Sequence, residues 1–184
     1  MKFFILLSIL LISSLFGCFE TTTPDVEFAN RLYSENKEEI DTVVTSLLNA
    51  EYYDMLISDS SGTMLTNTPE MGDYKLQTVE ISDSNTQKAC KHLIDTGIVK
   101  FFSKAYSQIK IGVWTKKEVY SYIVYSSNNT PPSVEYSTEE YQMDEEGWYY
   151  VIADYNEWRV RQREAGITRP YGGYKGQEDG SVFS

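Results

Sequence analysis

The sequence predicts an α+β domain in which two or three helices pack on an antiparallel β-meander. In the first half, apolar side chains recur at helical spacing, and the clearest stripe consists of Ile40, Val43, Val44, Leu47 and Leu48. After Gly97 the hydrophobic pattern becomes alternating, as in half-buried strands. The segments with this pattern, joined by short links, are 98–102, 108–114 and 119–125. Helices mixed with hairpins and followed by antiparallel strands are typical of the α+β class.

Two helical regions have recognisable starts. The first opens at Thr23-Pro24-Asp25, with a capping hydroxyl, proline at the first helical position and an acid in the first turn. Its pattern continues towards Asn49 with a break near Ser34. The second opens at Ser82-Asp83-Ser84 and ends at Gly97, where a left-handed residue is needed. Its expected buried stripe is Ala89, Cys90, Leu93 and Ile94.

The remaining strands and turns follow from alternation and from turn residues. Further strands are expected at 52–57, 63–66, 76–81 and 148–153. In the strand 108–114, one face should carry Ile109, Ile111 and Val113, and the other Lys110 and Trp114. The tightest turn is expected at 115–117. Residues 126–146, which include Pro131-Pro132, are expected to form a polar, acidic loop.

The first 17 residues have the three parts of an export signal, namely Lys2, the apolar stretch 3–16 and the small residue Gly17. The apolar stretch is shorter than the roughly 20 residues that span a bilayer. Leu15-Phe16-Gly17-Cys18 resembles the lipobox of bacterial lipoproteins. The resemblance implies cleavage before Cys18 and acylation of that cysteine, which would anchor the protein in a membrane. A plain secretory signal is the alternative.

Cleavage would leave 167 of the 184 residues, which suits one domain. We expect a tether at 18–23, a single α+β domain at 24–165 and a loosely ordered tail at 166–184. The leader carries one lysine and no acid, so the net charge changes from −11 to −12 on cleavage. This charge argues against a nucleic-acid partner and against electrostatic adhesion to anionic lipid. With Cys18 acylated, Cys90 is the one remaining thiol, and no internal disulfide is expected.

Four resemblances bear on location and fold. The lipobox implies a lipid-anchored protein of the cell envelope. By resemblance to sorting in enteric bacteria, Phe19 rather than aspartate after Cys18 favours the periplasmic side of the outer membrane over the inner membrane in a Gram-negative organism. Residues 93–155, with Tyr125-Ser126 and Gly147-Trp148-Tyr149-Tyr150, are similar to small uncharacterised bacterial lipoproteins, which implies no activity. Residues 55–65 resemble the first hairpin of extracellular PAS-like (Cache) sensor domains, which offers a PAS-like sheet as the alternative fold.

The sequence offers little catalytic chemistry. Cys90 and His92 are two apart on a predicted helix and therefore point to different sides, so a buried cysteine and a solvated histidine are favoured over a nucleophile pair. A zinc site needs more His and Cys ligands than the chain carries. The acids of the predicted loop lack the spacing of a calcium loop: Glu135, Glu139, Glu140, Asp144, Glu145 and Glu146. We expect no metal or cofactor, and a binding function is favoured over an enzymatic one.

The candidate binding residues are aromatic or basic. The chain contains 15 Tyr, 8 Phe and 3 Trp, and rings on a sheet face can bind sugars or a protein partner. Two pairs share a strand face, Tyr120 with Tyr122 and Trp148 with Tyr150. Packing between strands is the competing role for these rings. The run 158–163, if extended, would place Arg159, Arg161 and Arg163 on one side as an anion or partner site. Neutralising the protein's own acidic residues is the competing role, and it is favoured for these arginines.

Three classes of function are compatible with these features. The favoured class is a lipid-anchored binding or interaction module of the cell envelope, with an envelope protein or a glycan as its partner. The second is an envelope hydrolase with an acid-based site, which only the abundance of acids supports. The third is a structural envelope component. The anchor, the aromatic residues and the lack of a recognisable catalytic set together favour the first class.

Overall fold

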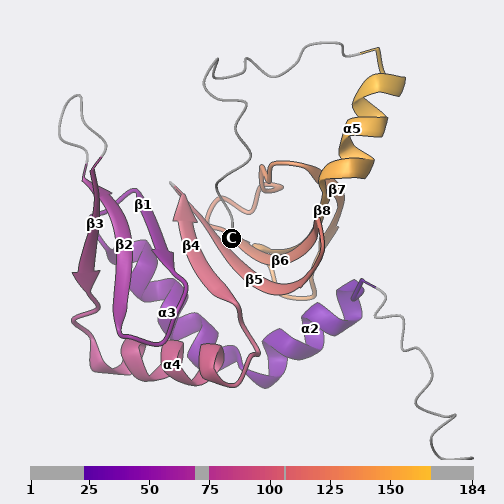
Figure 1. Ribbon diagram of the computed structural model, residues 1–184. Coiled ribbons are helices and arrows are strands. Elements are labelled where there is room, and N and C mark those ends of the chain that lie inside the picture. Colours follow the sequence, from indigo (N-terminus) through magenta and orange to yellow (C-terminus); the bar gives the residue numbers. More distant parts are fainter. Residues whose placement is uncertain (1–22, 69–74, 106, 167–184) are drawn as a thin grey trace, which may run out of the picture.

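The computed structural model describes residues 23–68, 75–105 and 107–166, which form one antiparallel sheet of eight strands and four helices (Figure 1). The helices are α2 (Val26–Glu35), α3 (Lys37–Asn49), α4 (Ser84–Asp95) and α5 (Tyr155–Glu164). The strands are β1 (Asp54–Ile57), β2 (Thr63–Thr68), β3 (Lys75–Glu80), β4 (Phe101–Ala105), β5 (Gln108–Lys116), β6 (Val119–Ser126), β7 (Ser137–Gln142) and β8 (Trp148–Asp154). The fold class is therefore α+β, as the sequence predicts. Within the described ranges, no helix is long and apolar enough to cross a membrane.

The sheet has one covered face and one open face. Its strand order is β3-β2-β1-β4-β5-β6-β8-β7. Helices α2, α3 and α4 lie along one face, with α3 beside α4, whereas α5 continues from the end of β8 (Figure 1). We call the face turned away from α2, α3 and α4 the open face.

The first helix begins later than the sequence predicts. Asp25, not Thr23, is its N-cap, and one carboxylate oxygen of Asp25 accepts a hydrogen bond from the Phe28 amide at 2.9 Å. Pro24 therefore lies before the helix, and its carbonyl accepts a hydrogen bond from the Tyr150 hydroxyl at 2.6 Å. The break expected near Ser34 occurs at Asn36, which separates α2 from α3.

Helices α3 and α4 bury the faces that their apolar spacing predicts. In α3 the buried residues are Ile40, Val43, Val44 and Leu47, and in α4 they include Ala89, Cys90 and Leu93. Leu48 and Ile94 are partly buried at the edge of the same cluster. Asp83 caps α4 through the Thr86 amide, at 2.7 Å. Gly97 has a φ of 73°, the left-handed conformation expected of a residue that ends a helix.

The strands after Gly97 are displaced from their predicted bounds. The strand expected at 98–102 begins at Phe101, because the preceding residues fold back and the Val99 amide donates to the Leu93 carbonyl at 3.0 Å. Strand β5 continues to Lys116, and the turn follows at Lys117, whose φ is 56°. A bulge between Gly112 and Trp114 changes which side later residues face. Trp114 consequently packs against the helix-side cluster, and its predicted place on the face of Lys110 is wrong.

Strand β7 lies inside the segment predicted to be an acidic loop, and that prediction is wrong for these residues. It is the edge strand beside β8, with Glu140 paired to Val151 and Tyr141 to Tyr150. Its last four residues are exposed, so β7 has no alternating hydrophobic pattern from which it could be predicted. Charged side chains on an edge strand discourage pairing with a further strand.

Hydrophobic clusters lie on both sides of the sheet. The larger joins side chains of α2, α3 and α4 to the helix side of the strands, from β1 to β8. The smaller lies on the other side and consists of Val124, Tyr149 and Val151, with Tyr122 and Val134 packed against it. Val134 belongs to the segment between β6 and β7, so this segment covers part of the open face.

Candidate binding groove

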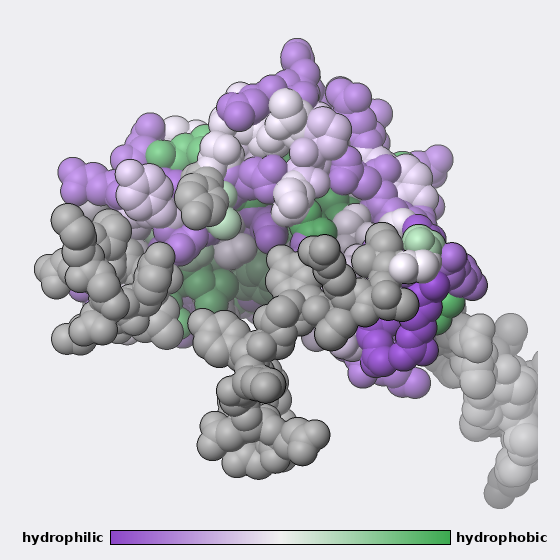
Figure 2. Space-filling model, turned by 90° about the horizontal axis from the view of Figure 1, so that it is seen from above, coloured by the Kyte–Doolittle hydropathy of each residue, from purple (hydrophilic) through white to green (hydrophobic). Residues whose placement is uncertain are grey.

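The open face is hollowed beside the segment that covers it, and Figure 2 shows this side of the molecule, with hydrophobic residues set among hydrophilic ones. The hollow has a volume of about 350 Å³ and is lined by strands β4 to β6 and by residues near the start of α5. We call it the open-face groove. Its aromatic lining residues are Phe101, Tyr120, Tyr122, Tyr136 and Tyr155. It therefore contains one of the two ring pairs that the sequence singled out.

The floor of the groove depends on the register of three neighbouring strands. Gly112 of β5 lies opposite Phe101 on one side and Tyr122 on the other. A Cβ atom at Gly112 would lie 2.4 Å from the Phe101 ring, so only glycine lets that ring lie across β5. The Phe101 and Tyr122 rings then meet edge to face, with centroids 6.1 Å apart. The Tyr120 ring lies parallel to that of Tyr122, with centroids 6.4 Å apart, and Tyr120 is 42% exposed.

The wall of the groove is a second set of rings. Tyr136 meets Tyr155 edge to face at 4.9 Å and Trp158 at 5.1 Å, measured between ring centroids. The Tyr136 carbonyl accepts a hydrogen bond from the Asp154 amide at 3.1 Å. Tyr136 has a φ of 61°, a left-handed conformation that costs a bulky residue about 1–3 kcal/mol. The surrounding contacts hold this strained residue against the start of α5.

Three charged side chains line the groove. Lys110 lies on the floor, between Ser103 of β4 and Val124 of β6 in the register of the sheet. Within the described residues, the Lys110 ammonium has no hydrogen bond and no ion pair. Glu118 accepts a hydrogen bond from the Asn156 side chain, and Glu135 is exposed. The groove is thus lined by aromatic rings and by a cation that has no partner in the described part of the chain.

Trp148 and Tyr150 do not line this groove. They lie on the helix side of β8 and are 3% and 0% exposed. The Trp148 ring packs against the Tyr33 ring, with centroids 4.4 Å apart. Their proposed role in a binding surface is therefore wrong, because α2 and neighbouring elements bury them. Tyr149, between them, packs in the smaller cluster on the opposite side.

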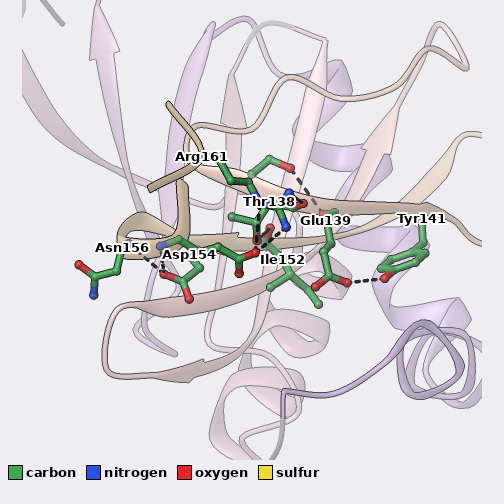
Figure 3. A network of polar contacts seen from close by, with 9 residues as sticks. Thr138, Glu139, Tyr141, Ile152, Asp154, Asn156 and Arg161 are labelled. Atoms are coloured by element: carbon green, nitrogen blue, oxygen red, sulfur yellow. Dashed lines mark hydrogen bonds and ion pairs between the residues drawn. The ribbon is translucent and has the colours of Figure 1, made fainter. Parts of the chain in front are cut away.

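The arginine run is helical, so the extended row of three guanidinium groups is also wrong. Asp154 caps α5 by accepting from the Asn156 and Glu157 amides at 2.9 and 3.0 Å. Arg161 donates to Glu157, one turn earlier, and to the Thr138 carbonyl of β7 at 2.7 Å (Figure 3). Arg161 therefore secures α5 to the edge of the sheet.

The other two arginines lie away from Arg161. On a helix, Arg159 and Arg163 share one side, whereas Arg161 points to another. The Arg159 guanidinium lies over the Tyr155 ring, 5.5 Å from its centroid. The three residues are exposed but form no single patch.

The thiol and the imidazole lie where the sequence places them. Cys90 is 2% exposed, and its burial raises the thiol pKa to about 12. His92 is exposed, and its Nδ1 lies 2.7 Å from Glu39 Oε2 of α3. The interpretation of Cys90 as a core residue and His92 as a surface residue is confirmed.

Sequence reasoning missed Lys104, the buried charged side chain of the described region. It is 7% exposed, and burial lowers its pKa below the ordinary lysine value. Its ammonium donates to the carbonyls of Leu47 at 2.8 Å and Ala50 at 3.0 Å, at the end of α3. A cation there complements the partial negative charge of the helix C-terminus, so Lys104 has a structural role. The sequence signal for its burial was its position two residues after Phe102, on the same face of a strand whose residues alternate between the two faces of the sheet.

A larger hollow runs between α3 and α4. Its volume is about 1060 Å³, and its lining is polar, with carboxylates such as Glu38, Asp41 and Asp83. It contains no aromatic ring and resembles a solvated interhelical surface. In the described ranges, no three His, Cys, Asp or Glu side chains are grouped so that they could hold a metal ion.

No protein-family model matches the sequence, and neither a curated protein nor a solved structure matches the chain. Aromatic rings, tyrosine hydroxyls and a lysine that lacks a partner among the described residues can bind a ligand by ring stacking, hydrogen bonding and charge.

Proposed function

We propose that this chain is a lipid-anchored binding protein of the bacterial cell envelope and that the open-face groove is its ligand site. The single observation that carries the proposal is that one groove on the open face is lined by aromatic rings and by Lys110, whose ammonium has no partner within the described residues. The open-face groove has a volume of about 350 Å³, which lies near the lower end of the range for ligand pockets, roughly 300–1000 Å³.

The anchor in this proposal is Cys18, acylated after cleavage of residues 1–17. The start of the domain is held in place at Pro24, because the Tyr150 hydroxyl donates a hydrogen bond to the Pro24 carbonyl at 2.6 Å. This hydrogen bond supports a tether that ends at a fixed point. Six residue steps separate Cys18 from Pro24, and an extended chain spans about 3.4 Å for each. The domain would thus begin within roughly 20 Å of the acylated residue. In a Gram-negative organism, the proposed location is the periplasmic side of the outer membrane.

The proposal also treats residues 24–165 as a single domain whose strands β4, β5 and β6 form the meander. The larger hydrophobic cluster supports a single domain, because it contains side chains from α2 through β8. The PAS-like sheet, the envelope hydrolase and the structural component remain as alternatives. A hydrolase of the glycosidase type would need a cooperating pair of carboxylates.

The first experiment tests the anchor. Cys18→Ser should abolish labelling by a fatty-acid analogue and release the protein from membranes, since the proposed anchor is the acyl group on this residue. Cell fractionation with parallel labelling measures both effects. A mutant that stays in the membrane fraction and still takes up the label would contradict the lipid anchor.

The second experiment tests the groove. Replacing Tyr120 and Tyr122 together with alanine should abolish capture of envelope material after cross-linking in cells. Tyr53→Ala is the matched control, because Tyr53 is 59% exposed and does not line the groove. Equal capture by both variants, with unchanged melting temperatures, would exclude the groove as the ligand site.

A further inference from the structure

We propose that the open-face groove recognises a glycan that carries one carboxylate group among otherwise neutral sugars. This inference rests on the proposed function and adds the chemical class of the ligand. It follows from where the rings lie, from the lysine that lines the same groove and has no partner within the described residues, and from the charge of the surrounding protein.

The rings suit the apolar faces of sugars. Tyr120 and Tyr122 stand parallel on one strand, and a pyranose presents a face of C–H groups that packs well on such rings. Their hydroxyls, with that of Ser103, can donate and accept hydrogen bonds. The Tyr122 hydroxyl is a donor at neutral pH, as in any protonated tyrosine, and burial raises its pKa further.

A peptide suits the groove less well because of where the groove lies on the sheet. Extended peptides are commonly recognised by adding a strand to a sheet edge, where backbone groups are unpaired. The floor here is formed by β4, β5 and β6, and β5 is paired on both sides. The floor can therefore recognise a ligand only through side chains, and these are rings, hydroxyls and one ammonium.

Lys110 provides the preference for an acid. Lys37 has a carboxylate partner in Glu145, at 3.0 Å, and Lys91 has one in Asp95, at 2.7 Å. Lys110 has none within the described residues, although the chain carries 27 acidic residues. A ligand carboxylate that reaches this ammonium forms a charge-assisted hydrogen bond, which is stronger than a neutral one.

The remaining charges limit how acidic the ligand can be. Glu118 and Glu135 also line the groove, and the whole chain has a net charge of −11. A polymer with an acid on every sugar would place further carboxylates near these residues, within the Debye length of about 8 Å at physiological salt. One carboxylate opposite Lys110 is attracted, whereas a dense row of them is repelled.

The test measures binding of short oligosaccharides by calorimetry to the whole acylated protein in detergent. The probes contain one glucuronic, galacturonic or N-acetylmuramic acid, and each is compared with the same oligosaccharide after reduction of its carboxylate to an alcohol. We expect at least one acidic probe to bind about tenfold more tightly than its reduced form, as for one charge-assisted contact. Polygalacturonate of the same sugar content should bind more weakly than the best probe.

Two variants separate the ring and charge contributions. Lys110→Met should remove the preference, so that the acidic probe and its reduced form bind with equal affinity. Tyr120→Ala should weaken both probes about equally, whereas the control Tyr53→Ala should change neither. Circular dichroism melting verifies that each variant is folded, and Lys110→Gln serves instead if the methionine variant is not.

Each outcome decides between the two proposals. Equal binding of an acidic probe and its reduced form, or a preference that survives in Lys110→Met, overturns the acidic glycan but leaves the groove as a glycan site. Failure of every probe, with tyrosine-dependent capture of an envelope protein in cells, overturns the glycan class and retains the binding function. Failure of both overturns the proposed function as well.

Discussion

Replacing Cys90 with alanine should make the stability of this protein less sensitive to alkaline pH. The thiol is 2% exposed, and burial raises its pKa from 9.0 to about 12. The unfolded chain loses this proton near pH 9, whereas the folded protein retains it. The stabilising contribution is therefore complete below pH 9 and is lost as the pH rises towards 12.

The magnitude follows from these two pKa values. A difference of one pKa unit corresponds to about 1.36 kcal/mol, so the full effect between pH 9 and 12 is about 4 kcal/mol. At pH 10 about 1.4 kcal/mol of it is already lost. The wild type should lose that much more stability than Cys90→Ala between pH 7.5 and pH 10. At pH 7.5 the alanine variant itself should be about 1 kcal/mol less stable, because apolar contacts of the sulfur are removed.

Urea denaturation under reducing conditions, at both pH values and for both proteins, measures this difference. Tyr33 also titrates in the alkaline range, since burial raises its pKa to about 12, but its contribution is common to both proteins and cancels. Thiol labelling provides a second readout, because Cys90 should react slowly in the folded protein and quickly in urea. Equal pH dependence of the two proteins, or fast labelling of the folded one, would refute a buried, protonated thiol.

Three further substitutions test the structure around the sheet. Gly112→Ala should destabilise the protein by about 1–3 kcal/mol in urea denaturation, because the new methyl group collides with the Phe101 ring; an unchanged midpoint would contradict that packing. Lys104→Met should lower the free energy of unfolding by about 1–3 kcal/mol, since two carbonyls at the end of α3 lose their charged donor. Faster amide exchange at the end of α3 would show that this end has become less stable. Arg161→Ala should increase proteolysis within α5 without shifting the main melting transition by more than a few degrees, and equal proteolysis in Arg163→Ala would show that the contact with β7 is unimportant.

The elements with strong periodicity were predictable from the sequence. The stripe from Ile40 to Leu47 identifies α3, and the stripe around Cys90 identifies α4, because one face of each helix is buried. Strand β7 could not be found in this way, since its exposed edge position imposes no apolar pattern. The bulge after Gly112 could not be found either, because it depends on pairing with β6. Helix α5 was not predicted, although Asp154, which caps it, is a residue type that favours the start of a helix.

The candidate site was predictable only in part. Alternation correctly puts Tyr120 and Tyr122 on one face of β6. Trp148 and Tyr150 also share a face, but six of the seven residues of β8 are buried. A strand buried on both sides gives no sign of which face meets the helices. The groove itself depends on the segment between β6 and β7 folding over the open face, a long-range contact with no local sequence signal.

The most direct test of the central claim is photo-cross-linking in living cells from inside the open-face groove. A photoreactive amino acid at Ser103, which lines the groove beside Lys110, should give adducts of raised mass that glycosidase treatment removes. The same amino acid at Thr45, in the hollow between α3 and α4, should give none. Adducts from Thr45 but not from Ser103, or no adducts from Ser103 in cells that contain the folded protein, would contradict the assignment of the groove as the ligand site.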